Sequence, residues 1–390
     1  MVCKKCNKRI KKDTVICPHC GAPQTETISL GAIHAAHTTP KKKRKVGKII
    51  GRILLILLAL LLACAVAAVT IMYRLVDNNI QHGSELEESE LEINEELPEE
   101  DVINIALFGL DNRDEDTDGH SDAIIILSID RVHNKIKMTS IARDTLVKVD
   151  GYWSKNNLTK VTHAFSYGAS KKNESGAGMA VKTLNQNFGM NISRYMYVSF
   201  PGFAEIIDYL GGVTIDVQQR ELKETNNNIR VLKRDTVLDG DMLTKSGVQK
   251  LTGIQALAYS RIRKLDSDVN RGNRQKMVLE AAFNEVKNQP VSRFPKIIAA
   301  CLNICHTNMS SGEILKLATW AVTSSPTIES FSLPDDSCKA WGGSHSSYGW
   351  VWIMDLNYAT ARLHDFIYET NVTENMTPRR YTTGGTIPIP

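Results

Sequence analysis

The chain of 390 residues lacks internal repeats and has no strong excess of charge of either sign. The absence of repeats excludes solenoids and propellers, which are built from one recurring unit. The formal net charge of +4 hides two blocks of opposite sign, so it excludes no class of partner by itself. With 42% hydrophobic and 23% charged residues, the composition is that of an ordinary globular protein that can bury at least one full core.

Charged residues are missing from residues 53–73, a stretch rich in Leu, Ile, Ala and Val. A buried soluble helix would show a polar face, and a signal peptide would have a shorter apolar region nearer the terminus. At about 1.5 Å per residue, a helix of this length spans roughly 30 Å, which is the thickness of the hydrocarbon core of a bilayer. The sequence therefore predicts one transmembrane helix over residues 49–74.

Two charged blocks flank this apolar segment. Residues 41–45 are all basic, and residues 85–101 carry ten acidic residues and no basic one. The positive-inside rule then places the N-terminus in the cytoplasm and the larger C-terminal part outside a cell membrane that the chain crosses once. We expect residues 25–48 to be a basic linker and residues 75–101 to be a solvated acidic spacer.

Cysteine is absent from residues 65–300, and half of the eight cysteines lie near the N-terminus. Cys3, Cys6, Cys17 and Cys20 form two CxxC pairs. Four thiolates at this spacing can surround Zn²⁺ tetrahedrally, and so short a segment needs the metal to fold. The sequence predicts a zinc ribbon over residues 1–24. A structural role or a cytoplasmic protein partner is expected for it, and nucleic acid is not expected as a partner.

Apolar runs alternate with helical periodicity in the globular part. Nearly continuous apolar runs cover residues 102–110 and 123–130, as in strands buried on both faces. Residues 135–142 follow a turn and are expected to pair with the second run as a hairpin. Further strands are predicted over residues 194–200 and 213–217, and helices over residues 177–188, 203–210, 248–259 and 271–286. The pattern predicts an α/β fold, a three-layer α-β-α domain with a mixed central sheet over residues 102–290.

The residues after 290 differ in character and form either an extension of this domain or a small accessory domain over residues 291–370. Helices are predicted over residues 294–305, 314–323 and 356–368, a strand over 328–333, and a loop rich in Gly, Ser and Trp over 341–352. Residues 371–390 are predicted to be a disordered tail. Cys301, Cys305 and Cys338 permit one disulfide, and the sequence does not fix the pair.

Acidic and basic residues gather at the ends of the predicted strands and in one basic segment. Asp111 closes the first strand, Asp122 opens the second, and Arg113 lies in the loop between them. Two carboxylates at strand ends suit Mg²⁺ with a bridging phosphate. Arg143 ends the third strand, and residues 260–275 add Arg261, Arg263, Lys264, Arg271 and Arg274. Because forked guanidinium groups match phosphate oxygens, this set predicts a site for a pyrophosphate with its metal ion.

Seven segments resemble the LytR-CpsA-Psr family of cell-envelope proteins, in the order INIALFGLDNR, HSDAIIILSID, KMTSIARDT, KVTHAFSYG, FPGFAEIIDYLGGVTIDV, LTGIQALAYSRIR and DVNRGNRQ. The resemblance covers residues 102–287. It implies a Mg²⁺-dependent phosphotransferase outside the membrane of a Gram-positive bacterium. Such an enzyme moves a glycopolymer from a polyprenyl pyrophosphate carrier to peptidoglycan, forms a phosphodiester at a muramic acid hydroxyl, and releases polyprenyl monophosphate.

The resemblance also implies roles for individual residues by their motif positions. Asp111 and Asp122 would act at the Mg²⁺, and Asp268 would orient or deprotonate the acceptor hydroxyl. The residues implied to bind the pyrophosphate are Arg113, Arg143, Lys160, Arg261, Arg263, Arg271 and Gln275, of which Arg143 would also be catalytic. The apolar residues 198–207 would line a groove for the polyprenyl tail.

One position departs from the family pattern. The family usually has an arginine two residues before the second metal-site aspartate, where this chain has His120. Histidine keeps a hydrogen-bond donor but loses the permanent charge and the forked geometry. The substitution predicts a pyrophosphate affinity that is lower or dependent on pH.

Two other classes of function stay open. One is a membrane-tethered regulator, in which the ribbon binds a cytoplasmic partner and the outer domain senses lipid-linked wall precursors. The other is hydrolysis of the same pyrophosphate, with water in place of the wall acceptor. Retention of Asp111, Asp122 and Arg143 favours the transferase over the sensor, because a sensor does not need metal-binding and hydroxyl-activating residues.

Overall fold

The computed structural model describes residues 1–24, 62–63, 67–68, 70–84, 86–97, 101–111, 119–172, 174–263, 265 and 268–381. The chain forms two compact units, Met1–Ala65 and Val66–Pro390. In the first unit, the isolated bridges Val2–Arg9 and Ile16–Pro23 close two short turns. Its small buried core is formed by Cys3, Ile10 and Cys17. The two CxxC pairs therefore belong to one compact segment.

The second unit is built on a seven-stranded mixed sheet. In the order of the sheet, its strands are β1 (Gln81–His82), β10 (His306–Thr307), β7 (Arg194–Ser199), β2 (Val102–Leu110), β3 (Ser121–Asp130), β4 (Lys135–Ile141) and β11 (Thr327–Leu333). β3 is antiparallel to both β2 and β4, whereas β7 is parallel to β2 and β11 is parallel to β4. The predicted hairpin of the second and third strands is confirmed.

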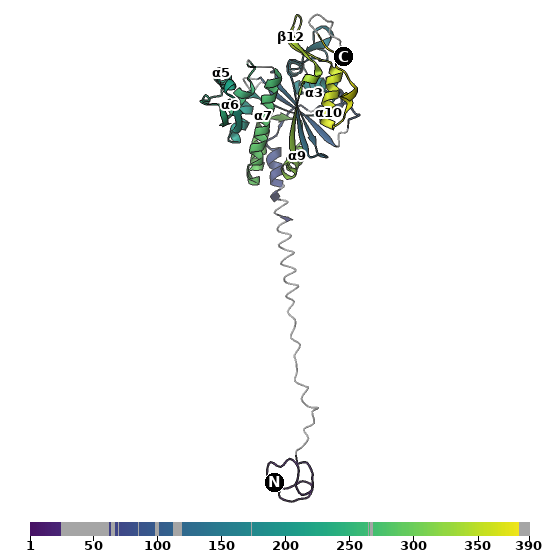
Figure 1. The fold of residues 1–390 in the computed structure, drawn as a ribbon, viewed down its shortest axis with the longest axis vertical. Helices are drawn as coiled ribbons and strands as arrows, with labels where there is room; N and C mark the ends of the chain where they lie inside the picture. Colours follow the sequence, from purple (N-terminus) through teal and green to yellow (C-terminus); the bar gives the residue numbers. More distant parts are fainter. Residues whose placement is uncertain are drawn as a thin grey trace. The chain divides into compact units, whose positions relative to one another are not determined.

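Helices cover both faces of the sheet (Figure 1). One face carries α2 (His163–Ala169), α3 (Gly176–Phe188) and α10 (Leu356–Tyr368), and the other carries α7 (Asp268–Lys287), α8 (Phe294–Ile304) and α9 (Ser311–Ser324). Side chains alternate along a strand, so Ala106 and Phe108 of β2 join the core with α3, while Ile105 joins the core on the other face. The predicted α/β fold with a mixed central sheet is confirmed.

A lobe beside α7 holds α4 (Phe200–Tyr209), α5 (Gln219–Asp235), α6 (Gly253–Ser260) and the hairpin of β8 (Val213–Val217) and β9 (Gly247–Leu251). Figure 1 shows α5 and α6 on the opposite side of α7 from α10. The prediction of one helix over residues 248–259 is wrong in its first part. Residues 247–251 alternate in burial as a strand, and Thr252 then begins α6 with a capping box to Gln255.

The residues after 290 extend the same fold. β10 and β11 complete the central sheet, and Leu363 and Ile367 of α10 are buried in the core with β2 and β3. The segment predicted as a loop forms the hairpin of β12 (Trp341–His345) and β13 (Gly349–Ile353). The remaining short elements are β5 (Leu146–Lys148) paired with β6 (Leu158–Lys160), and the 3-10 helices η1 (Glu88–Glu90), η2 (Lys155–Asn157), η3 (Val291–Arg293), η4 (Asp336–Cys338) and η5 (Val372–Asn375).

Two segments are more ordered than the sequence predicts. In the acidic spacer, β1 joins the central sheet and Leu91 is buried in the core, because its apolar residues find a hydrophobic surface on the sheet. In the tail, the Asp365 carboxylate accepts hydrogen bonds from the backbone N–H groups of Val372 and Thr373, which fixes η5. Residues 382–390 lie outside the described residues, as does the predicted linker over 25–48.

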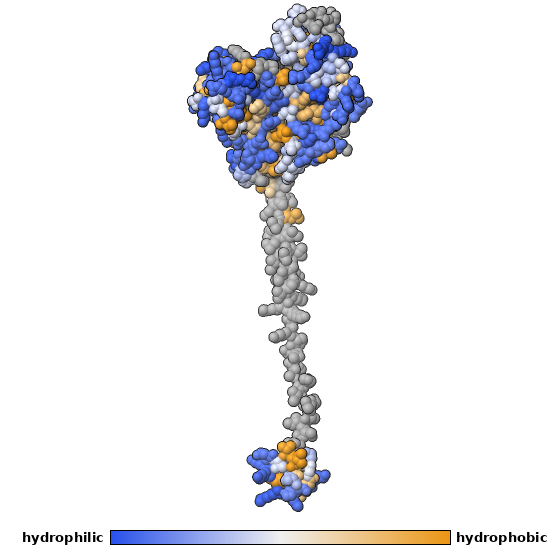
Figure 2. Space-filling view, in the orientation of Figure 1, coloured by the Kyte–Doolittle hydropathy of each residue, from blue (hydrophilic) through white to orange (hydrophobic). Residues whose placement is uncertain are grey.

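The predicted transmembrane segment is described only in part. Its residues 49–61, 64–66 and 69 lie outside the described residues, and the remainder is helical. Within the described residues, no helix combines the length and the apolar character that crossing a membrane requires. The face of the second unit drawn in Figure 2 is mainly hydrophilic, with smaller hydrophobic patches between the polar residues.

Candidate functional site

A cavity of about 520 Å³ lies between the central sheet and helices α4, α6, α7 and α8. One part of its wall is apolar and includes Leu107, Ile125, Met196, Phe203, Ile206 and Leu279. The other part is polar and consists mainly of Asp111, Asp122, Arg143, Arg261, Arg263, Arg271 and Gln275. We call these two parts the apolar wall and the polar rim. The structure thus gathers most of the site residues expected from the sequence around one cavity.

The topology of the sheet explains why distant residues meet at the polar rim. β3 runs antiparallel to β2 and β4, so the start of β3 and the ends of its two neighbours lie at the same edge of the sheet. Asp111 follows β2, and its backbone N–H donates to the carbonyl of His120 at 3.0 Å. Asp122 is the second residue of β3, and Arg143 follows β4. Two carboxylates and a guanidinium are therefore held by rigid strands.

Arginines surround the two carboxylates of the rim. Arg143 donates through Nη1 to Asp122 Oδ1, and Arg271 Nη2 donates to the backbone carbonyl of Asp122 at 3.2 Å. Arg261 Nη2 lies 3.9 Å from Asp111 Oδ1. Its guanidinium also stacks over the Phe200 ring, 4.4 Å from the centroid, which fixes the direction of the cation. The rim combines acceptors for a hard metal ion with donors for phosphate oxygens.

Asp144, which follows Arg143 at the end of the third predicted strand, organises the cations of the rim. Its carboxylate is 2% exposed and accepts from Arg263 Nη2 at 2.8 Å, while Lys160 Nζ lies 2.9 Å from its other oxygen. Burial by itself raises the pKa of Asp144, but the hydrogen bond from Lys160 and the charges of Arg143, Lys160 and Arg263 outweigh it and hold the pKa below its usual range. Lys160 therefore lies next to the rim, paired with Asp144.

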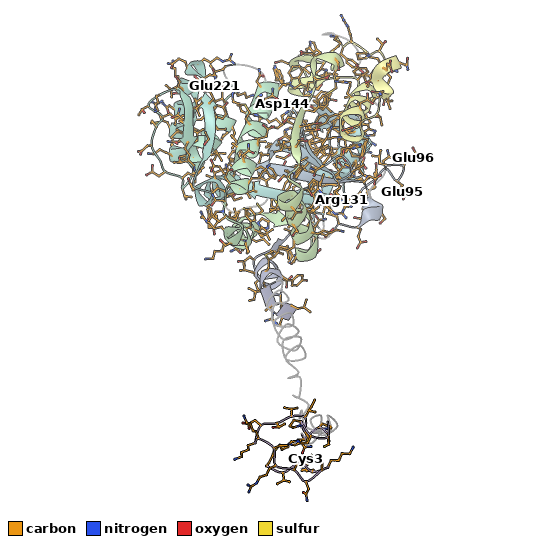
Figure 3. All side chains as sticks on the ribbon, turned by 60° about the horizontal axis from the view of Figure 1, so that its bottom comes forward. Cys3, Glu95, Glu96, Arg131, Asp144 and Glu221 are labelled. Carbon is orange, nitrogen blue, oxygen red and sulfur yellow. The ribbon has the colours of Figure 1, made fainter. Side chains whose placement is uncertain are left out.

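Of the four other basic or acidic candidates, one is placed away from the rim, and three lie wholly or partly outside the described residues. Arg274 is buried in an ion pair with Glu221 at 2.8 Å and donates to the Ile262 carbonyl at 3.1 Å, so its expected contribution to the anion site is wrong. Figure 3 labels Glu221 in the lobe of α5, away from Asp144. Asp268 is the first residue of α7, and its side chain lies outside the described residues. Arg113 and Lys264 also lie outside them.

His120 is not among the described residues that line the cavity. Its Nδ1 is 2.9 Å from Ser166 Oγ, and its ring centroid is 4.9 Å from that of His163. Burial, together with the charges of His120 and Lys160, lowers the pKa of His163 to about 4, so His163 is neutral near pH 7. The imidazole that replaces the family arginine thus contacts the Ser166 hydroxyl and the His163 ring.

The apolar wall includes one segment expected from the sequence, and it also contains two cysteines. Val198, Phe200 and other residues of the segment 198–207 line the cavity, as the resemblance implies. Cys301 and Cys305, one helical turn apart at the end of α8, line it as well. Both are free thiols, as is Cys338, and burial raises the pKa of Cys301 to about 11. Cys301 and Cys305 are therefore free thiols of the apolar wall.

The four N-terminal cysteines meet in the first unit. The sulfur atoms of Cys3 and Cys20 are 3.6 Å apart, those of Cys6 and Cys17 are 3.7 Å apart, and all four lie within 4.8 Å of one another. A tetrahedral zinc site with bonds of about 2.3 Å has sulfur–sulfur edges of about 3.8 Å. The donor set and its spacing therefore fit a tetrahedral Zn²⁺ ion.

Two teichoic acid transferases are similar in sequence to much of this chain. A polyisoprenyl-teichoic acid–peptidoglycan teichoic acid transferase, TagU of Oceanobacillus iheyensis, is 33% identical over 231 residues, which are 58% of this chain and 65% of that protein. The transferase TagT of Bacillus subtilis is 29% identical over 252 residues, 63% of this chain and 72% of that protein. This chain thus spans slightly less than two thirds of the length of the first relative.

Solved structures have the same fold, and a family model covers the second unit. TagT bound to LI-WTA superimposes with a TM-score of 0.57 at 22% identity, covering 73% of this chain and 100% of that one. TagT with bound octaprenyl pyrophosphate lipid gives a TM-score of 0.54 at 21% identity, with the same coverage. The model of the LytR_cpsA_psr family matches residues 68–357, well over half of the chain. The chain therefore belongs to the LytR_cpsA_psr family.

Proposed function

We propose that the protein is a phosphotransferase that moves a glycopolymer from a polyprenyl pyrophosphate carrier to peptidoglycan on the outer side of the cell membrane. One observation carries the proposal: a single cavity joins the apolar wall to the polar rim, where four arginines outnumber two aspartates. A polyprenyl pyrophosphate has the same two parts, a long apolar tail and a head with several negative charges. A site that holds both must bury hydrocarbon next to guanidinium groups, which few other ligands require.

The relatives support this choice of substrate. TagU and TagT are named as transferases that move teichoic acid from a polyisoprenyl carrier to peptidoglycan. One TagT structure is named for a bound octaprenyl pyrophosphate lipid. The lipid tail in our proposal occupies the apolar wall, and the pyrophosphate lies at the rim, within reach of Arg261, Arg263 and Arg271.

The proposed reaction is an in-line displacement at the phosphorus that carries the sugar. The acceptor hydroxyl oxygen forms a new bond to this phosphorus, its proton passes to a base, and the bond to the bridging oxygen breaks. Polyprenyl monophosphate leaves, and a phosphodiester remains. Asp268 is the proposed base, while Arg143, Arg261, Arg263, Arg271 and Gln275 bind and neutralise the pyrophosphate. We include Arg113 and Lys160 in this set from their motif positions.

A Mg²⁺ ion suits the same rim. Asp111 and Asp122 offer hard carboxylate oxygens where the phosphate oxygens would lie, and these are the ligands that Mg²⁺ prefers. When bound, the ion neutralises charge that develops on the leaving phosphate. The protein fixes the two carboxylates through the strands β2 and β3, and Arg143 orients the Asp122 carboxylate.

The proposed topology follows from the sequence. Residues 49–74 anchor the chain as a single span, residues 1–24 remain in the cytoplasm, and the LytR_cpsA_psr domain lies outside. In this arrangement the first unit is free to bind a cytoplasmic protein partner. Exposed peptidoglycan and lipid-linked glycopolymer are both accessible to the second unit.

A reconstituted reaction tests the proposed function. The full chain in detergent is incubated with a short lipid-pyrophosphate saccharide, Mg²⁺ and peptidoglycan oligomers, beside the variants Arg263→Ala and Asp111→Ala. We expect saccharide joined to peptidoglycan with the wild type, and loss of this product with either variant or with a Mg²⁺ chelator. Lipid monophosphate without joined product would indicate hydrolysis instead. Binding of the lipid without any turnover would favour the sensor.

We also propose that Cys3, Cys6, Cys17 and Cys20 hold one Zn²⁺ ion, and we expect one zinc per purified chain. Replacing Cys17 by serine removes a ligand, so the variant should lose zinc and its N-terminal thiols should react rapidly with a thiol reagent. Elemental analysis and thiol titration measure both effects. Cys338→Ser is the matched control and should keep its zinc. Equal zinc contents in the two variants would contradict the proposal.

A further inference from the structure

A second hollow lies on the other face of α7. This cleft, which we call the polar cleft, has a volume of about 850 Å³ and lies between α7, β11 and the segment that follows β11. Its wall includes Asn270, Asn273, Lys276, Glu280, Ser330 and Ser332. None of the site residues predicted from the sequence belongs to this wall. The proposed function therefore leaves the polar cleft without a role.

Helix α7 separates the two hollows. Successive residues of a helix turn by about 100°, so Arg271, Gln275 and Leu279 share one face, and Asn273 and Lys276 point away from it. The first three line the cavity, and the last two line the polar cleft. The remaining side of α7 lies directly on the sheet, because a Cβ on Gly272 would be only 2.3 Å from Ser140 Oγ of β4. The two hollows therefore flank the same first turns of α7.

Hydrogen bonds between α7 and β11 hold polar side chains in place on the wall of the polar cleft. Ser332 Oγ donates to Asn273 Oδ1 at 2.9 Å and accepts from Lys276 Nζ at 2.7 Å. Ser330 Oγ donates to Glu280 Oε1 at 2.6 Å. These bonds fix amide and hydroxyl groups on rigid elements, which is the arrangement that recognises the hydroxyl and acetamido groups of a sugar.

The polar cleft differs from the polar rim in its charge and in its aromatic lining. Lys276 and Lys339 are opposed by Glu280, Asp335 and Asp336 in its wall, so it has no cationic excess. A polyanionic polymer gains nothing there, whereas an uncharged sugar chain is accommodated. Trp352 also lines the cleft, and an aromatic ring face can pack against the C–H face of a sugar ring.

We propose that the polar cleft binds the glycan strand of the peptidoglycan acceptor. This inference rests on the proposed function and deepens it, because it assigns the acceptor to its own site. The donor pyrophosphate lies on the Arg271 face of α7, and the acceptor sugar lies on the Asn273 face. Both faces begin at the N-terminus of α7, where Asp268 starts the helix and where Val269 and Asn270 line the cleft. The acceptor hydroxyl then reaches the phosphorus around this helix end.

A binding experiment tests the acceptor site without the donor. The full chain in detergent is titrated with a soluble tetrasaccharide of alternating N-acetylglucosamine and N-acetylmuramic acid. Its lactyl carboxyl groups are amidated, so the probe is uncharged, and binding is followed by calorimetry or by saturation-transfer NMR. We expect the double variant Asn270→Ala, Asn273→Ala to raise the Kd by roughly fivefold to tenfold or more, as loss of hydrogen bonds predicts. Asn284→Ala is the matched control, since this α7 residue borders a different hollow. Its Kd should equal that of the wild type.

Kinetics with the donor present separate this inference from the proposed function. The double variant should raise the KM for peptidoglycan oligomers by a similar factor and leave the Kd of the lipid-pyrophosphate saccharide unchanged. Asp336→Ala, on the exposed opposite wall, provides a second variant if the first fails to fold. Transfer with unchanged acceptor KM and Kd in both variants would overturn the acceptor site and leave the transferase standing. Tetrasaccharide binding that both variants weaken, with no transfer by the wild type, would retain the site and reject the transferase.

Discussion

An Arg261→Ala variant is expected to lose transfer activity by about two to three orders of magnitude while keeping its fold. The guanidinium of Arg261 lies at the polar rim, 3.9 Å from the Asp111 carboxylate, and the Phe200 ring fixes it by stacking. Removing it takes away a preorganised cation where the pyrophosphate gains charge on leaving. The measurement is kcat/KM for the lipid-pyrophosphate saccharide, with thermal unfolding to verify the fold.

Two further variants make the Arg261 result specific. Arg261→Lys keeps the charge but loses the forked donors, so its activity should fall between those of the wild type and the alanine variant. Arg230→Ala removes an exposed arginine of α5 that donates to Asn227, and it should retain full activity. Equal activities of Arg261→Ala and Arg230→Ala would show that Arg261 does not act on the substrate.

Replacing Asp144 by asparagine should lower both activity and stability. Its buried carboxylate binds Arg263 and Lys160 directly, and Arg143 Nε is 3.6 Å away. Without the negative charge, the three cations lose the buried partner that they share, and Arg143 and Lys160, which are 20% exposed, are only partly solvated. We expect a loss of about 3 kcal/mol in the free energy of unfolding and roughly a hundredfold loss of transfer activity. Denaturant unfolding and the transfer assay measure the two effects.

The stability difference at Asp144 should depend on pH in one direction. The folded-state pKa of Asp144 is lowered, whereas the carboxyl in the unfolded chain has a pKa of about 3.9. The unfolded state therefore binds the proton first as the pH falls. The contribution of the carboxylate is fully present above about pH 4 and is lost as the pH falls through the folded-state pKa. The difference in the free energy of unfolding between the wild type and Asp144→Asn should therefore decrease over that acidic range.

Asp150→Asn is the matched control for Asp144. Asp150 also has a lowered pKa and pairs with Lys148 and Lys182, but its side chain is 28% exposed. Exposed pairs contribute less than about 1 kcal/mol, so this variant should be nearly as stable as the wild type and fully active. Similar losses in the two variants would show that burial at the rim is not what makes Asp144 important.

Local patterns in the sequence predict part of the fold well. β2, β3 and β4 follow from continuous apolar runs, and the short connection between β3 and β4 favours their pairing. The strand β9 was harder to predict, because its five residues precede a capping box and continue the apolar period of α6. Helix α5 is missing from the predictions, since Ile229 and Leu232 are among its few buried apolar residues. Short or strongly polar elements depend on the surface they pack against.

Residue types at strand ends likewise predict part of the rim. Asp111, Asp122 and Arg143 follow from strand order, because alternating strands bring their ends to one edge of the sheet. The choice among the basic residues of the segment 260–275 is different. Arg263 forms an ion pair with Asp144, which is 119 residues away in the sequence, and Arg274 forms one with Glu221, which is 53 residues away. Nothing local to the sequence separates these two arginines.

The sequence by itself determined the chemistry available to this protein: four thiols in one short segment, carboxylates at strand ends, and many guanidinium groups after α6. The spacing of the cysteines and the alternation of apolar residues in the strands can be read within a few residues of sequence. The local backbone geometry keeps these residues at the same relative positions after folding. Only the tertiary structure decided which arginines face the cavity, that Asp144 binds several cations, and that α7 carries a hollow on each side. Such pairings depend on packing between elements distant in sequence, where burial and charge select one partner among many.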